Sequence, residues 1–219
     1  APTMTLTYTL RSITGIGRVT SVTSSTVVEV AVLREFGGTS AVDSWREGQW
    51  SDRRGWPTAG VFHEGRLTWH GRDKAVLSVS DGFDNFDPDY EGDAGPINRS
   101  LATEGVDTIN WALSLQRLLL GGQIAEYSIR SSSLDEPLTP TNYNPKETGT
   151  EGTAPVPAVK VGDSGVFVQR GGTRVFELAW GSTGIDYQET HLSALIPEIG
   201  QPGIVRIAVQ FQPDVRIHF

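Results

Sequence analysis

Hydrophobic and polar residues alternate along much of this chain with a period of two. The pattern is clear at 5–10 and again at 28–32, where Thr and Val dominate. Such alternation is typical of half-buried strands, because successive side chains of a strand point to opposite faces. Gly15 and Gly17 interrupt the pattern as a tight hairpin or a bulge would. We therefore expect residues 1–52 to form a small β domain, barrel-like or sandwich-like, that ends in a Trp-rich connector.

A second pattern repeats from residue 55 onward. Each copy has an apolar strand, a short turn and an alternating strand, as at 66–71 with 75–80, 118–122 with 125–130, and 166–172 with 175–180. The equivalent positions Leu67, Leu119, Phe167 and Ile217 are 52, 48 and 50 residues apart. A further strand candidate precedes each copy, at 59–63, 109–113, 158–161 and 204–209. The repeat therefore predicts at least three strands in each unit.

A period of about 50 residues lies in the range of β-propeller blades, which are four-stranded sheets set around an axis. We expect an all-β chain in which residues 53–219 form propeller-like blades, at about 55–100, 101–150, 151–200 and a truncated 201–219. Residues 109–120 also fit an amphipathic helix, but the equivalent segments of the other copies are strands. The alternating end at 215–219 stops without a turn or cap, which predicts a fragment of a longer chain.

Two long segments between the copies, 81–98 and 131–157, are rich in turn-forming residues. Loops of this length are usually functional or poorly ordered, and here we expect contact arms between subunits. The first contains a run of acidic residues: Asp81, Asp84, Asp87, Asp89, Glu91 and Asp93. Residues 87–92 match the start of a calcium loop, but Asn98 stands where the bidentate Glu belongs and Pro88 stiffens the segment. We therefore expect a solvated acidic loop at 81–93.

The tryptophans allow two interpretations. Trp45, Trp50 and Trp56 lie among charged residues in 34–56. Tryptophan is usually largely buried, so we expect these rings to pack within a connector, with an exposed platform for sugar rings as the alternative. Three others occupy different places in their copies, which favours a role in the core: Trp69, Trp111 and Trp180.

Motifs for catalysis, metal and cofactor binding are missing from the sequence. There is no Cys, no Gly-x-Ser-x-Gly, no dinucleotide turn and no phosphate loop. The four histidines fall in no metal-ligand spacing: His63, His70, His191 and His218. His63 and His70 lie in expected strands, where we expect each to be packed or hydrogen-bonded. A glycosidase site made of two carboxylates that are distant in sequence stays an alternative, because such a pair leaves no sequence motif. We predict no enzyme, and no catalytic, cofactor-binding or metal-binding residues.

Composition narrows the possible partners. The 219 residues carry a net charge of −8, which opposes tight nucleic-acid binding and is compatible with a surface that DNA slides past. No stretch approaches the ~20 apolar residues of a membrane span, and the first residues lack the pattern of a signal peptide.

Several stretches together resemble tail proteins of phages and prophages. They are 44–51, 54–57, 61–67, 100–103, 138–141, 167–172 and 210–214, in the same order over roughly 15–219. The chain is similar to the tail tubular protein B, or tail nozzle, family of podoviruses and to the related tail-hub stabilisation proteins. Some members carry an N-terminal β segment said to resemble a domain of ubiquitin-activating enzymes. That label would fall on residues 1–50 and implies no ubiquitin chemistry.

The resemblance implies a structural role in the virion tail. It implies a homo-oligomeric ring, typically six-fold, that contacts adaptor or portal-proximal proteins and tail fibres and encloses the tail tube channel for DNA ejection. The family offers no catalytic residues to carry over. Two other functions stay open: a carbohydrate- or receptor-binding propeller of a phage tail, and a tail glycan hydrolase.

Overall fold

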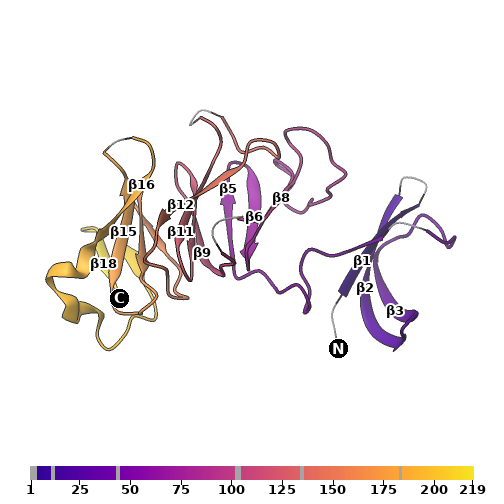
Figure 1. Ribbon diagram of the computed structural model, residues 1–219, viewed down its shortest axis with the longest axis horizontal. Helices are drawn as coiled ribbons and strands as arrows, with labels where there is room; N and C mark the ends of the chain where they lie inside the picture. The colour runs from indigo at the N-terminus through magenta and orange to yellow at the C-terminus, as the bar shows by residue number, and fades with distance from the viewer. Residues whose placement is uncertain (1–3, 11–12, 43–44, 102–104, 134–135, 183) are drawn as a thin grey trace. The chain divides into compact units, whose positions relative to one another are not determined.

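The alternating pattern of the sequence forms antiparallel strands throughout the part of the chain that can be described (Figure 1). The structure is a computed structural model and describes residues 4–10, 13–42, 45–101, 105–133, 136–182 and 184–219. It is all-β and contains several small antiparallel sheets. The chain divides into two compact units, Ala1–Trp56 (unit 1) and Pro57–Phe219 (unit 2), which are described separately.

Unit 1 contains a four-stranded antiparallel sheet in the order β3-β2-β1-β4. Its strands are β1 (Met4–Leu10), β2 (Ile13–Ser24), β3 (Val27–Arg34) and β4 (Trp45–Glu47). Gly15 and Gly17 lie inside β2, where the register shifts between Ile16 and Gly17, so the bulge interpretation is confirmed. The hairpin interpretation is wrong, because the turn between β2 and β3 falls at residues 25–26. A barrel or sandwich closure of unit 1 stays a prediction.

Unit 2 contains three consecutive four-stranded antiparallel sheets, each a meander in which sequence neighbours pair. The first sheet is β5 (Ala59–His63), β6 (Arg66–Gly71), β7 (Lys74–Leu77) and β8 (Ile97–Arg99). The second sheet is β9 (Ile109–Ser114), β10 (Leu118–Gly122), β11 (Glu126–Arg130) and β12 (Asn144–Gly149). The third sheet is β13 (Val159–Val161), β14 (Ser164–Val168), β15 (Val175–Trp180) and β16 (Tyr187–His191).

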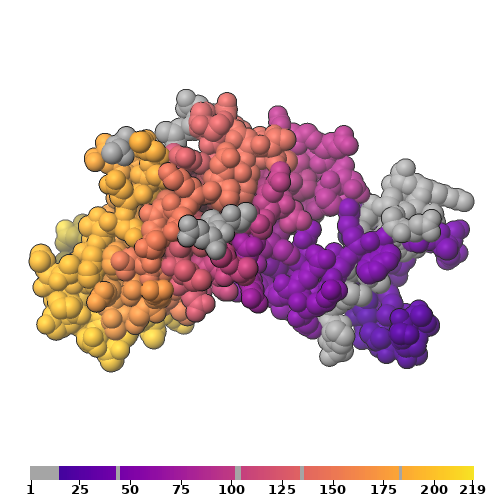
Figure 2. Space-filling model, in the orientation of Figure 1, coloured from indigo at the N-terminus to yellow at the C-terminus, as the bar shows by residue number. Residues whose placement is uncertain are grey.

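A two-stranded hairpin follows the third sheet. Two short 3₁₀ turns, η1 (Leu192–Leu195) and η2 (Pro197–Gly200), lead to β17 (Ala208–Gln210) and β18 (Arg216–His218). The prediction of strands at 109–120 is confirmed by β9 and β10, and the helical alternative there is wrong. In Figure 2 the consecutive sheets of unit 2 follow one another along the surface in sequence order, from magenta to yellow.

The three apolar cores of unit 2 lie between successive sheets. Ala75, Leu77, Leu118 and Leu120 belong to the core between the first and second sheets. Leu119, from the same strand β10, instead packs with residues of the third sheet: Phe167, Phe176 and Leu178. The last core joins the third sheet to the hairpin region through Val166, Val168 and Ile204. The second sheet is thus buried on both faces, which explains the uninterrupted run Leu118-Leu119-Leu120 in place of alternation.

The fourth strand of each sheet lies where the sequence suggested a loop or gave no strand candidate. β8 ends the expected loop 81–98, β12 lies within the expected loop 131–157, and β16 follows β15. β8 (Ile-Asn-Arg) and β12 (Asn-Pro-Lys-Glu-Thr-Gly) lie at sheet edges and are mostly polar, so their composition does not show the apolar pattern of the central strands. The expectation that 81–98 and 131–157 are loops throughout is therefore wrong.

Candidate functional site

A pocket of about 240 Å³ opens where loops from all three sheets of unit 2 meet. It lies between the β5–β6 turn, the β9–β10 turn, the loop after β11 and the loop before β16. Its polar lining comes from Glu64, Arg117, Arg130, Ser131 and Glu136. The pocket therefore gathers charged groups that are far apart in the sequence.

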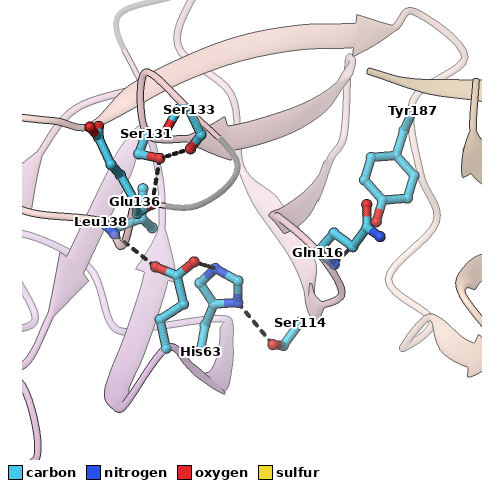
Figure 3. Close-up of polar contacts among 9 residues, drawn as sticks. His63, Ser114, Gln116, Ser131, Ser133, Glu136, Leu138 and Tyr187 are labelled. Atoms are coloured by element: carbon cyan, nitrogen blue, oxygen red, sulfur yellow. Dashed lines mark hydrogen bonds and ion pairs between the residues drawn. The ribbon is translucent and has the colours of Figure 1, made fainter. Parts of the chain in front are cut away.

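His63 precedes Glu64 of the pocket lining and connects two sheets (Figure 3). Its Nδ1 lies 2.9 Å from Ser114 Oγ at the end of β9, and its Nε2 lies 3.6 Å from Glu64 Oε1. Glu64 Oε2 accepts a hydrogen bond of 2.7 Å from the backbone N–H of Leu138. The network thus ties the β5–β6 turn to the second sheet and to the loop before β12.

The Ser114–His63–Glu64 arrangement contains the residue types of a nucleophile, a base and an orienting carboxylate. A hydrolytic role requires that substrate reach the imidazole, yet His63 is only 4% exposed. Burial lowers the pKa of His63, and the charge of Glu64 opposes this to a smaller extent. These contacts support a cross-link between the first and second sheets.

A second polar cross-link joins the second and third sheets. Asp186 Oδ1 lies 2.9 Å from Arg117 Nη1, and its Oδ2 lies 3.9 Å from Arg130 Nη1 and accepts a hydrogen bond from Ser128 Oγ at 3.2 Å. The Arg117 guanidinium also lies 4.8 Å from the centre of the Trp180 ring. The carboxylate is thus held between two cations at an edge of the pocket.

The acidic loop 81–93 lies apart from these contacts and is anchored at its end by one buried side chain. Arg66 donates hydrogen bonds to the backbone oxygens of Ser78, Asp93 and Gly95 at 2.7, 2.7 and 2.6 Å. Five of the six acidic residues are exposed, as a solvated loop requires. Asn98, at the twelfth position of the calcium-like stretch, lies in β8 opposite Val76.

The histidines do not come together as a ligand set. His63 lies in β5 and His70 in β6, where His70 is fully buried and its Nε2 lies 3.0 Å from Thr68 Oγ1. The expectation that both are packed or hydrogen-bonded is confirmed. Among the described residues, no group of three or more His, Cys, Asp or Glu side chains is arranged to hold a metal ion.

The structure buries some of the tryptophans as the sequence predicted and exposes others that were expected to be packed. Trp111 is buried and Trp180 packs against the core between the second and third sheets, as expected. Trp45 and Trp56 are 64% and 52% exposed, so the expectation of connector packing is wrong for these two rings. The Trp56 indole N–H donates to Asp52 Oδ1 at 2.9 Å, so the ring is held by one edge.

Sequence reasoning missed a pair of acidic residues inside unit 2. Glu126 of β11 is fully buried, and Glu189 of β16 has one carboxyl oxygen buried without a hydrogen-bond partner. The alternation at 125–130 gives no sign that Glu126 is buried, because a half-buried strand carries polar side chains on its solvent face. The sequence feature that could have indicated the burial of Glu126 is the continuous apolar run in the neighbouring strand β10, since such a run is typical of a sheet covered on both faces.

A scan against protein-family models found no match to this chain, and a search of curated proteins found none either. Membership of the tail nozzle family therefore stays a prediction. The described residues include no helix with the length and apolar character needed to cross a membrane.

Proposed function

We propose that this chain is a structural, non-catalytic component of a bacteriophage tail, located in the virion and assembled with copies of itself into a ring. The ring would surround the channel through which DNA is ejected. Support comes from the resemblance of 44–57, 61–67 and 167–172 to tail nozzle proteins and from the architecture of unit 2. Three four-stranded meanders stacked face to face fit consecutive blades of a β-propeller.

The observation that carries the proposal is the exposed edge strand β3. It lies at the edge of its sheet, is eight residues long, and seven of those residues are exposed. Val27, Val32 and Leu33 are 53%, 54% and 56% exposed. A long, apolar, exposed edge is a template for pairing with another chain, and proteins that stay monomeric usually protect such an edge.

Head-to-tail pairing of such edges gives a ring when the rotation between subunits closes. Permanent interfaces commonly bury more than about 2,000 Å², so β3 would act together with other surfaces. The net charge of −8 suits a channel that DNA passes without specific binding. Adaptor or portal-proximal proteins and tail fibres are the further partners that the resemblance implies.

Light scattering of the full chain at micromolar concentration tests this function. We expect a ring-sized particle, either alone or after the adaptor is added. The double variant Val32→Lys with Leu33→Lys should stay small, because charged side chains on an edge oppose strand pairing. Ile124→Lys removes an equally exposed apolar residue (53%) from a turn of unit 2 and should leave assembly unchanged.

Circular dichroism of each variant separates failed assembly from failed folding. A wild-type chain that stays monomeric with the adaptor present, and that is absent from purified virions, would rule out the structural function.

The exposure of Trp45 and Trp56 favours one other candidate, a carbohydrate- or receptor-binding part of a tail. Faces of exposed tryptophans stack on sugar rings, and these two rings are available in unit 1. If this is the function, host polysaccharide should shift tryptophan fluorescence of the wild type, and Trp56→Ala should weaken binding at least about tenfold, equal to ~1.4 kcal/mol. Trp111→Phe, at a buried ring, should leave binding unchanged.

A further inference from the structure

Two acidic side chains face the interior between the second and third sheets of unit 2. Glu126 lies in β11 opposite Gly121 and Gly149, and Gly121 is also opposite Trp111, a member of the core between these sheets. Glu189 lies in β16 opposite Leu178 of the same core. The two carboxyl groups therefore come from different sheets and point into one interface.

The Glu126 carboxyl is closed off from solvent, and the half-buried Glu189 has one enclosed carboxyl oxygen. Glu126 is 0% exposed, and neither of its carboxyl oxygens has a hydrogen-bond partner. Glu189 Oε1 is likewise buried and without a partner. A Cβ on Gly149 would lie 1.9 Å from Glu189 Oε1, so the Glu189 carboxyl occupies the space that Gly149 leaves beside Glu126.

Two ionised carboxylates are strongly disfavoured in such a place, because burial removes their hydration and like charges repel. One proton relieves both costs, since a protonated carboxyl can donate a hydrogen bond to its ionised neighbour. We propose that Glu126 and Glu189 share a single proton at neutral pH and that this proton latches the second sheet to the third. This inference does not depend on the tail function.

The electrostatics of the site agree with the geometry. Burial, contact with Glu189 and the charges of Glu189 and Glu151 raise the pKa of Glu126 to about 9, against a smaller lowering by the Glu151 backbone. Burial raises the pKa of Glu189 as well, but its contact with Glu126 lowers it. The pKa values of both groups are raised, so the pair holds a proton at a pH where a solvated carboxyl is ionised.

The other charged groups described on these elements do not neutralise the Glu126–Glu189 pair in place of the proton. Glu151, which follows β12, adds negative charge. Asp186 before β16 is held by Arg117 and Arg130. The remaining basic groups on this face are Lys146 of β12, which is exposed, and His191 of β16, which stacks on Phe176 with ring centres 4.6 Å apart.

The sign of the pH dependence follows from the raised pKa. The unfolded Glu126 would titrate at 4.5 and the folded one at about 9. Protonation therefore stabilises the fold fully below 4.5, and this contribution is lost as the pH rises toward 9. The interface between the second and third sheets should loosen at alkaline pH.

Infrared spectroscopy of the full chain tests the proposal directly. At about pH 7 ordinary carboxyl groups are ionised, so the C=O stretch of a protonated carboxyl stands out. We expect this band in the wild type, its loss near pH 9, its absence in Glu126→Gln, and its retention in Glu147→Gln, an exposed residue of β12. Absence of the band from the folded wild type overturns the proposal, whether or not the variants fold.

Urea unfolding supplies a second measurement. The wild-type midpoint should fall between about pH 6 and pH 9, and the midpoint of Glu126→Gln should change little, because a carboxamide donates to Glu189 without a proton. An equal fall in both proteins would also overturn the proposal.

Discussion

The imidazole of His70 is fully buried in the first sheet, and its Nδ1 has no hydrogen-bond partner. Burial, with a smaller contribution from His63, lowers the pKa of His70 to about 3. The neutral ring is therefore part of the folded structure, in the same way that the protonated carboxyl of Glu126 is. The pKa of His70 is lowered and the pKa of Glu126 is raised. His70 therefore limits the stability of the fold at acidic pH, and Glu126 limits it at alkaline pH.

We predict that the fold loses stability as the pH falls from 6.5 toward 3, because the unfolded His70 takes up a proton that the folded one excludes. Between about pH 7 and pH 5 the loss from this residue should be about 2 kcal/mol. Urea unfolding followed by tryptophan fluorescence measures it. The slope with pH should be smaller in His70→Gln and unchanged in His218→Gln, an exposed histidine. Equal slopes in all three proteins would contradict the prediction.

At the scale of single elements, strand β8 prevents the acidic loop from closing as a calcium loop. Residues 87–92 resemble the start of a calcium loop, and Gly92 has the positive φ of 92° that the sharp turn needs. The loop would have to continue to residue 98, but Asn98 is held in β8 by pairing with Val76. The residue at the twelfth ligand position is thus part of a sheet and does not lie in the loop.

We therefore predict no tight calcium binding at 81–93, and none after Asn98→Glu supplies the missing carboxylate. Calorimetry with calcium should show no dissociation constant below about 10 µM for either protein, the range of sensor sites. Tight binding by Asn98→Glu alone would mean that β8 detaches readily from the first sheet.

The first three strands of each sheet of unit 2 were predictable from the sequence, and the fourth strands were not. Residues 59–63 match β5, whose Ala59 and Val61 pack against the first core, and residues 66–71 match β6. The strand candidate at 204–209 is only partly correct, since β17 begins at Ala208. The fourth strand β12 lies at a sheet edge and contains no large apolar residue, so nothing in its composition predicts a strand.

At the scale of the whole chain, the period of about 50 residues gave the number and order of the sheets in unit 2. It did not give the buried side chains between them. Alternation assigns Glu126 and Ser128 to a solvent face, and only the third sheet covers that face. The Glu126–Glu189 pair and the pocket lined by Glu64 and Arg130 both depend on contacts between sheets, which a local pattern does not encode.

The face-to-face burial of the second sheet also bears on how the chain folds during synthesis. Every sheet of unit 2 pairs strands that follow one another in sequence, so its strand pairing is local and favours fast folding, although long segments join β7 to β8 and β11 to β12. A newly made sheet covers the apolar face left by the one before it and exposes a fresh face of its own, as Leu118 and Leu119 do on the two sides of β10. Unit 2 should therefore assemble in the order of translation, and a ribosome that pauses after β12 would leave Leu119 and Trp111 open to chaperones.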